Sequence, residues 1–129
     1  MPVKARTILL VEDSHVNQKV THFLLTKLGF EVELTDSGRD AIVLAAKKEY
    51  ALILMDLRLP VVDGLKATMS IREAEALSKA KRRVPIVALT ASALPGDRQA
   101  CLEAGMDDYI SLPFSEQGLR DILTRWIGG

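Results

Sequence analysis

Acidic residues directly follow two of the apolar segments in this sequence, and a third apolar segment ends in a threonine. Glu12 and Asp13 come after the run TILLV, Asp56 ends the run LILMD, and Thr90 ends VPIVALT. An unpaired carboxylate at the end of a buried strand is costly, because an apolar interior solvates charge poorly. The positions of these side chains therefore suggest a chemical role.

The chemistry that these residues can perform depends on whether their side chains lie close together in the folded protein. Taken singly, Glu12 and Asp13 can cap the helix that follows, and Thr90 is a common strand residue. Taken together, three carboxylates repel one another and resist ionisation, and a divalent cation relieves that repulsion. Oxygen ligands with room left for water or phosphate suit Mg²⁺. A carboxylate beside such a cation can attack phosphorus, so Asp56 is the candidate phosphoryl acceptor and Thr90 a candidate hydrogen-bond donor to the phosphoryl group.

Short apolar segments alternate with segments of helical spacing along the chain. Strands are predicted at residues 7–11, 30–35, 50–56, 84–90 and 108–111. The second of these alternates apolar and polar residues, which is typical of a half-exposed strand near a sheet edge. Helices are predicted from about residue 16 to Gly29, from Ser37 onward, over 65–76, up to Ala104 and after Ser115, and residues 91–97 are predicted to form a loop.

Two of these helices have a clear apolar face. In the last helix, capped by Ser115, the face is formed by Leu119, Ile122, Leu123 and Trp126. In the first helix it is formed by Val16, Val20, Phe23, Leu24 and Leu28. The side chains of this first face cannot all be buried in the core if the helix also offers an apolar patch to a partner.

Five strands alternating with five helices predict an α/β domain with a parallel sheet covered by helices on both sides. A chain of 129 residues is long enough for one such domain. In open parallel sheets, sites lie outside the carboxyl ends of the strands. We therefore expect Glu12, Asp13, Asp56 and Thr90 to lie together at the carboxyl edge of the sheet, in a site that we call the acidic mouth.

The amino-acid composition limits the kinds of partner that the domain can bind and the cellular compartment in which it is expected. Lys+Arg and Asp+Glu both number 17, so no net charge draws the domain to nucleic acid or to an anionic membrane. No apolar run approaches the length of a membrane span, and the amino terminus lacks the apolar core of a signal peptide. The single cysteine excludes an internal disulfide, and the basic run at residues 79–83 is interpreted as a solvated loop. We expect a cytoplasmic domain that neither binds nucleic acid nor inserts into a membrane.

Four segments together resemble the receiver domain of two-component response regulators. They are ILLVEDSHVNQKV, LILMDLRLPVVDG, PIVALTASAL and AGMDDYIS with the Pro-Phe that follows, and the resemblance covers residues 6–127. The first and last segments are most similar to receivers attached to hybrid histidine kinases. The resemblance implies that residues 1–129 form one doubly wound (βα)5 flavodoxin-like receiver domain, with a five-stranded parallel sheet in the order 2-1-3-4-5.

The resemblance also implies roles for individual residues. Asp56 matches the phosphoacceptor, Thr90 the residue that contacts the phosphoryl group, and Tyr109 the switch aromatic. The implied Mg²⁺ ligands are Glu12, Asp13, Asp56 and the backbone carbonyl of Arg58. The phosphoryl donor would be a phosphohistidine on a histidine kinase or a histidine phosphotransfer domain. Two arrangements stay open, a domain on its own and a part of a larger hybrid kinase. Such a domain is not an enzyme, although it assists its own phosphorylation and dephosphorylation.

One position departs from the family pattern. The family has a lysine before the proline of the fifth-strand motif, where this chain has Leu112, and no lysine lies between Gly105 and Gly129. Loss of this cation should weaken transition-state charge stabilisation by a factor of about 10² to 10³. The family often has a cis peptide bond at this place, which makes Leu112–Pro113 a candidate for one.

The resemblance leaves two docking surfaces open. One is the first-helix face beside the acidic mouth, flanked by His15 and Lys19. The other is formed by the fourth helix, fifth strand and last helix near Tyr109.

Other functions fit the sequence less well or stay open. The main alternative is a receiver-like module that binds proteins without being phosphorylated. A phosphatase of the haloacid dehalogenase type requires a second aspartate two residues after the nucleophile, where this chain has Arg58. A flavin-binding flavodoxin requires a neutral, hydroxyl-rich loop after the first strand, where this chain has the acidic segment VEDSHVN.

Overall fold

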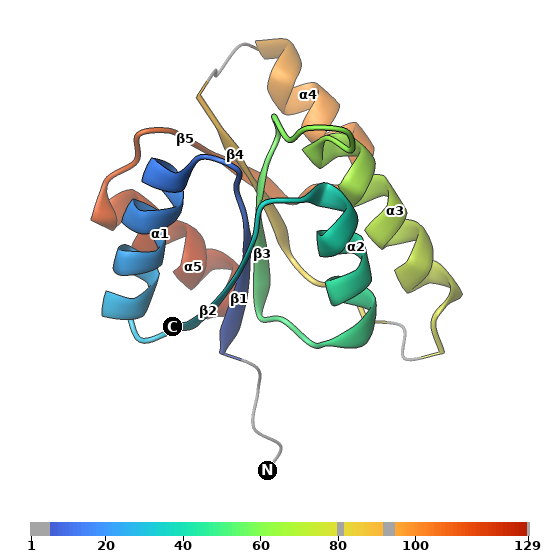
Figure 1. Ribbon diagram of the computed structural model, residues 1–129, viewed down its shortest axis with the longest axis horizontal. Helices are drawn as coiled ribbons and strands as arrows, with labels where there is room; N and C mark the ends of the chain where they lie inside the picture. The colour runs from blue at the N-terminus through green and yellow to red at the C-terminus, as the bar shows by residue number, and fades with distance from the viewer. Residues whose placement is uncertain (1–5, 80–81, 92–94, 129) are drawn as a thin grey trace.

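The computed structural model describes residues 6–79, 82–91 and 95–128 (Figure 1). In these residues five strands alternate with five helices. Their bounds are β1 Thr7–Val11, α1 His15–Lys27, β2 Glu31–Thr35, α2 Gly38–Lys47, β3 Leu52–Asp56, α3 Gly64–Leu77, β4 Ile86–Thr90, α4 Pro95–Ala104, β5 Asp108–Ser111 and α5 Glu116–Ile127.

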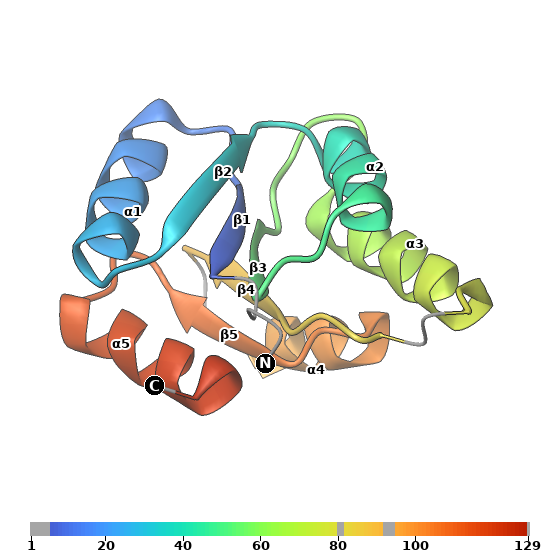
Figure 2. The ribbon, with the colours of Figure 1, turned by 90° about the horizontal axis from the view of Figure 1, so that it is seen from below.

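The strands form one parallel sheet in the order β2-β1-β3-β4-β5, which confirms the predicted fold. Helices α1 and α5 cover one face of the sheet, while α2, α3 and α4 cover the other (Figures 1 and 2). The half-exposed second strand lies at the edge, as its alternating pattern predicted. The chain reverses its winding direction between β1 and β3, so their carboxyl ends form the topological switch point of the sheet.

Two apolar clusters hold the helices onto the sheet. On the α2–α3–α4 face, side chains such as Ile53 and Met55 of β3 pack with Ile71 of α3. On the opposite face, Leu52 and Leu54 pack with side chains of α1 and α5. Residues 52–55 are fully buried, and burying one such side chain stabilises the fold by about 1.5–3 kcal/mol. The continuous apolar run of β3 thus reflects a strand covered on both faces.

Polar caps and glycines define most helix boundaries. The hydroxyl of Ser115 accepts a 2.9 Å hydrogen bond from the backbone N–H of Gly118, which confirms the predicted cap of α5. Gly29 follows α1 with φ of +95°, a conformation that glycine adopts without strain. Strands β3 and β4 begin two residues later than predicted, and one helix boundary also differs. Residues 95–97 belong to α4 rather than to a loop, because proline fits the first turn of a helix, where its missing N–H has no intrahelical partner. The remaining loop residues, 92–94, lie outside the described part of the chain.

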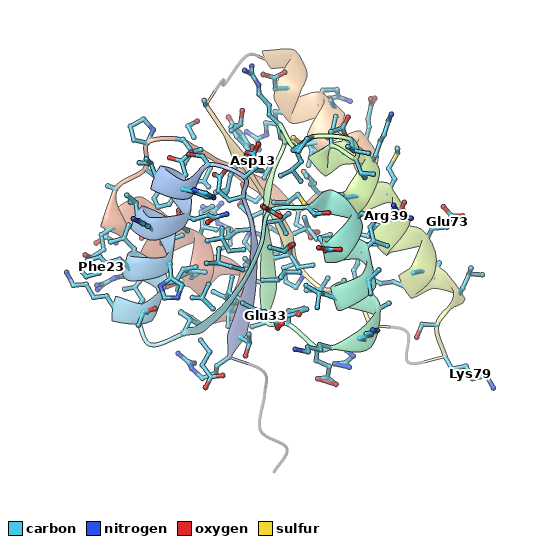
Figure 3. The ribbon with its side chains drawn as sticks, viewed as in Figure 1. Asp13, Phe23, Glu33, Arg39, Glu73 and Lys79 are labelled. Carbon is cyan, nitrogen blue, oxygen red and sulfur yellow. The ribbon has the colours of Figure 1, made fainter. Side chains whose placement is uncertain are left out.

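The predicted apolar face of α1 divides into two parts. The residues of this helix that are buried on the sheet are Thr21 and Leu25. Leu24 and Leu28 pack partly against the core, whereas the side chains of Val16, Val20 and Phe23 are 70%, 51% and 65% exposed. Phe23 points outward from the helix (Figure 3). The single face inferred from the sequence was therefore wrong, and Val16, Val20 and Phe23 form what we call the α1 patch.

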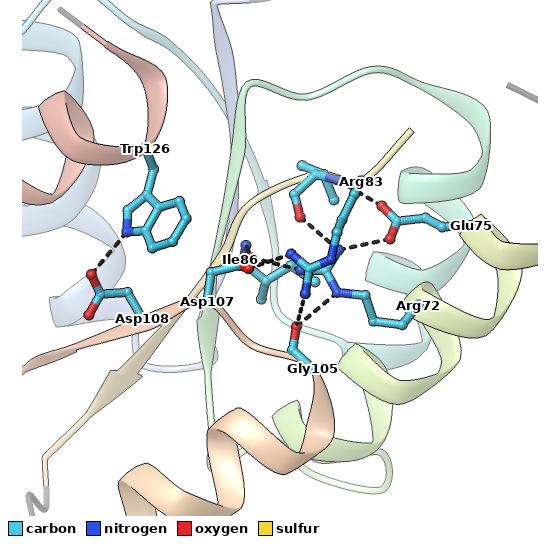
Figure 4. Close-up of polar contacts among 9 residues, drawn as sticks. Arg72, Glu75, Arg83, Ile86, Gly105, Asp107, Asp108 and Trp126 are labelled. Carbon is cyan, nitrogen blue, oxygen red and sulfur yellow. Dashed lines mark hydrogen bonds and ion pairs between the residues drawn. The ribbon is translucent and has the colours of Figure 1, made fainter. Parts of the chain in front are cut away.

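An arginine joins the two helices α3 and α4 to the amino ends of β4 and β5 (Figure 4). The guanidinium of Arg72 donates hydrogen bonds of 2.7–2.8 Å to the carbonyl oxygens of Val84 and Gly105 and to the carboxylates of Glu75 and Asp107. Its side chain is largely buried, so these partners have little access to water as a substitute. None of the described helices has the length and hydrophobicity needed to cross a membrane.

Candidate functional site

Three carboxylates meet at the switch point of the sheet. Glu12 and Asp13 follow β1, Asp56 ends β3, and the two strands are neighbours with Val11 opposite Met55. One carboxylate oxygen from each of the three residues lies within 4.8 Å of the others. Asp13 lies at the carboxyl end of the sheet, by the start of α1 (Figure 3). The structure therefore brings together the acidic residues that strand-end reasoning placed in one mouth.

The three acids differ in burial and in hydrogen bonding. Glu12 is 1% exposed, and its Oε2 accepts a 3.1 Å hydrogen bond from the backbone N–H of Ser14. Its Oε1 is buried and has no hydrogen-bond partner among the described residues. Asp13 is exposed, while Asp56 is partly buried and accepts a 3.0 Å hydrogen bond from the backbone N–H of Arg58. Within the described residues, none of the three acids forms an ion pair with a lysine or arginine.

This crowding changes the acidity of Asp56. Burial, followed by the hydrogen bond that the protonated Asp56 carboxyl donates to the neighbouring Glu12 and by the charges of Glu12 and Asp13, raises the pKa of Asp56 to about 8. The N–H of Arg58 opposes this rise only partly. Around neutral pH the Asp56 carboxyl therefore holds a proton unless another positive charge is supplied.

The donor set fits a hard divalent cation. All three side chains offer carboxylate oxygen, and Glu12, whose Oε1 has no hydrogen-bond partner among the described residues, belongs to the cluster. Oxygen-only sites with a few carboxylates are those that Mg²⁺ prefers, because it keeps several of its own waters. A cation here would replace the proton on Asp56 and would free that carboxylate as a nucleophile.

Gly64 and Gly38 shape the loop after Asp56. A Cβ atom at Gly64 would lie 2.3 Å from the carbonyl oxygen of Asp56, and one at Gly38 would lie 2.3 Å from the carbonyl oxygen of Val62. Neither position can hold a larger residue without moving backbone, so glycine lets the loop pack closely on α2 and β3. Val61 lies in this loop at φ +66° and is 96% exposed, a strained conformation for a β-branched residue.

The remaining predicted residues lie on β4 and β5. Thr90 is buried at the end of β4, one residue past the position that pairs with Asp56. Tyr109 packs against the α2–α3–α4 face, and the guanidinium carbon of Arg98 lies 5.5 Å from the centre of its ring. The Leu112–Pro113 peptide bond is cis, as expected. The Leu112 side chain packs instead against the apolar cluster on the α1–α5 face.

A doubly wound parallel sheet with an acidic cluster at its switch point defines a class of open α/β domains whose candidate site lies outside the carboxyl ends of the strands. The response regulator receiver domain family matches residues 8–124. The chain therefore belongs to the receiver domain family of two-component systems.

Its relatives include large signalling kinases. The chain is 42% identical over 121 residues to hybrid signal transduction histidine kinase G of Dictyostelium discoideum, a match covering 92% of this chain but 3% of that protein. It is 50% identical, with a TM-score of 0.85, to the receiver domain of sensor histidine kinase PA1611 of Pseudomonas aeruginosa PAO1, solved with a magnesium ion in its active site cleft. That match covers 97% of this chain and 99% of the other.

A third relative was solved with a partner. The receiver domain of the Saccharomyces cerevisiae response regulator Ssk1, in a co-crystal with the histidine phosphotransfer protein Ypd1, is 32% identical with a TM-score of 0.86. The match covers 98% of this chain and 91% of that chain.

Proposed function

We propose that this domain accepts a phosphoryl group on Asp56 from a phosphohistidine, in a Mg²⁺-dependent two-component phosphorelay in the cytoplasm. The observation that carries the proposal is the meeting of Glu12, Asp13 and Asp56 at the switch point of a receiver-family sheet. The proposed domain comprises residues 1–129 and has no further enzymatic activity beyond assisting its own phosphorylation and dephosphorylation.

In the proposed reaction, an oxygen of Asp56 forms a bond to phosphorus while the P–N bond of the phosphohistidine breaks and the imidazole leaves with the electron pair. Glu12, Asp13, Asp56 and the backbone carbonyl of Arg58 would hold Mg²⁺, whose positive charge offsets the carboxylates and the phosphoryl oxygens. The hydroxyl of Thr90 would donate a hydrogen bond to a phosphoryl oxygen. Tyr109 would respond to the change at Thr90 as the switch aromatic.

We propose the α1 patch as the docking surface for a histidine kinase or phosphotransfer domain. Helix α1 begins two residues after Asp13, so the patch lies beside the acidic cluster. Its exposed apolar side chains are flanked in sequence by Lys19, and such a patch on a small domain favours a protein partner. The Ssk1 receiver shows that a close fold relative binds a phosphotransfer protein, and the relationship to hybrid kinases supports a place within a larger hybrid histidine kinase.

A second candidate function rests on Leu112. Among the described residues, no lysine or arginine pairs with the acidic cluster, and the Leu112 side chain packs into an apolar cluster. A receiver without this cation would be phosphorylated slowly or would switch poorly. It could then serve as a binding module whose partners do not depend on phosphorylation.

The two functions are distinguished by mass spectrometry of the intact protein after incubation with acetyl phosphate and Mg²⁺. Phosphorylation on Asp56 predicts one added phosphoryl group in the parent and none in Asp56→Asn or in the presence of EDTA. If the parent gains no mass while a partner still binds it, the binding module is the better description.

A further inference from the structure

A groove lies at the opposite end of the sheet from the acidic cluster. It has a volume of about 520 Å³ and is formed by the carboxyl-terminal halves of α2 and α3 and by the segments that lead into β3 and β4. Helices α2 and α3 lie side by side on the same face of the sheet (Figures 1 and 2). The groove takes no part in the proposed phosphoryl transfer.

The floor of the groove is apolar. Its lining includes Ile42, Ala45, Tyr50, Ile71, Ala74 and Val84. The polar backbone of Val84 is already paired, because its N–H donates a 2.8 Å hydrogen bond to Glu75 and its carbonyl oxygen accepts one of 2.7 Å from Arg72. These side chains give the floor an apolar character, and the volume of the groove lies in the range of small-molecule sites.

The rim of the groove is predominantly basic. Among the described residues that line it, Lys47, Lys48, Arg82 and Arg83 are cations, and Glu49 and Glu75 are the carboxylates. Glu75 is already bound to Arg72 and to the N–H of Val84. Arg82 and Arg83 come from the basic run that sequence analysis interpreted as a solvated loop, whose residues 80–81 lie outside the described part of the chain.

Two of these cations, Arg82 and Lys47, can turn toward a ligand at little cost. Lys48, Arg82 and Arg83 form ion pairs with Glu33, Glu49 and Asp107, and of these three carboxylates only Glu49 is as exposed as its cation. An ion pair exposed on both sides contributes at most about 1 kcal/mol, so exchanging Glu49 for an anionic ligand group costs Arg82 little. Lys47 has no ion-pair partner within the described residues.

We propose that this groove binds a small organic anion, with a flat apolar body that lies on the floor and one acidic group that meets the basic rim. This would give the domain a ligand site separate from its acidic cluster. The proposal does not depend on phosphorylation of Asp56.

The test uses 8-anilinonaphthalene-1-sulfonate, which has such a body and one sulfonate, titrated by fluorescence into the full chain. Ala74→Phe fills the groove from an exposed helix position, and Lys47→Glu reverses the charge of the unpaired cation. We expect saturable binding to the parent, weakened about tenfold or more by Ala74→Phe and about three- to tenfold by Lys47→Glu. Circular dichroism melting checks that both variants fold.

Two controls address other surfaces that could bind the probe. Lys19→Glu changes a charge on α1, and Phe23→Ser removes apolar surface from the α1 patch. Both should bind the probe as the parent does, and amide NMR shifts should centre on Tyr50, Ala74 and Val84. Equal affinity in Ala74→Phe and the parent, loss of binding in Phe23→Ser, or shifts centred on the acidic cluster would overturn the proposal.

Discussion

The backbone N–H of Leu112 donates a 2.7 Å hydrogen bond to the carbonyl oxygen of Thr90, which joins the end of β5 to the end of β4. The Leu112 side chain packs against the same apolar cluster as Phe114 and Trp126. The backbone connection between the two strand ends is thus present, while the side chain at this position offers no charge to the acidic cluster.

Leu112→Lys should therefore increase the rate of phosphorylation from acetyl phosphate, because an ammonium group stabilises the charge that develops on the phosphoryl oxygens. The gain should be on the order of 10² if the cation acts like an oxyanion donor. Rates are measured by intact mass, and NMR shifts of Thr90 and Tyr109 on adding beryllofluoride report switching. Leu112→Met, which changes the shape but adds no charge, should show no gain. Full shifts of Tyr109 in the parent, or no gain in Leu112→Lys, would mean that the missing cation is not what limits this domain.

The stability of the cation-free protein should depend on the charge of Asp56. In the unfolded chain its pKa is near the ordinary value of about 3.9, whereas in the folded protein it is raised to about 8. Between these values the folded state binds more protons, so the stabilising contribution of this carboxyl is lost as pH rises from about 4 to 8.

Without Mg²⁺, Asp56→Asn should melt at a higher temperature than the parent at pH 8, and the difference should shrink toward pH 5. Calorimetry at several pH values measures it, with the exposed Asp121→Asn as a control that should not change the pH dependence. A lower melting temperature for Asp56→Asn at pH 8 would contradict the crowding of the three carboxylates.

Mg²⁺ should bind more tightly as pH rises from 6 to 8, since the proton held by Asp56 competes with the cation. Isothermal calorimetry measures this affinity together with the protons released. Asp13→Ala should weaken binding by roughly tenfold or more, because a direct carboxylate ligand is lost, while Asp121→Ala should bind like the parent. Unchanged binding in Asp13→Ala would show that the cation binds elsewhere.

The α1 patch should carry partner binding. Phe23→Ser and Lys19→Glu should each weaken the affinity for a histidine phosphotransfer domain that binds the parent, as measured by calorimetry. Leu102→Ser tests the other surface, since this half-exposed residue lies on α4. If Leu102→Ser weakens binding and the α1 variants do not, docking uses the face near Tyr109.

Arg72→Leu should lower the free energy of unfolding by about 2–4 kcal/mol, because Glu75, Asp107 and the carbonyl oxygens of Val84 and Gly105 each lose a hydrogen bond from a largely buried guanidinium, although Arg83 still donates to Asp107 and Gly105. Urea denaturation measures the loss. Arg120→Ala removes only an exposed pair with Glu116 on α5 and should change stability by no more than about 0.5 kcal/mol. Equal effects of the two substitutions would show that the Arg72 contacts contribute little to stability.

The sequence by itself determined the fold class and the position of the acidic cluster. Buried parallel strands appear as continuous apolar runs, so LILMD and TILLV were recognisable, and the carboxyl ends of parallel strands lie at one edge of the sheet. The sequence alone therefore predicted that Glu12, Asp13 and Asp56 lie together. The receiver motifs added Thr90 and Tyr109, because both residues match positions with known roles in the family.

Tertiary structure alone decided features that depend on how elements pack. Apolar spacing along α1 could not tell which side chains are buried, because rotation of the helix about its axis is set by contact with the sheet, which here selects Thr21 and Leu25. The raised pKa of Asp56 depends on desolvation and on neighbours brought from another strand. The close approach of Gly64 to Asp56, and the basic groove between α2 and α3, exist only once segments distant in sequence are packed together.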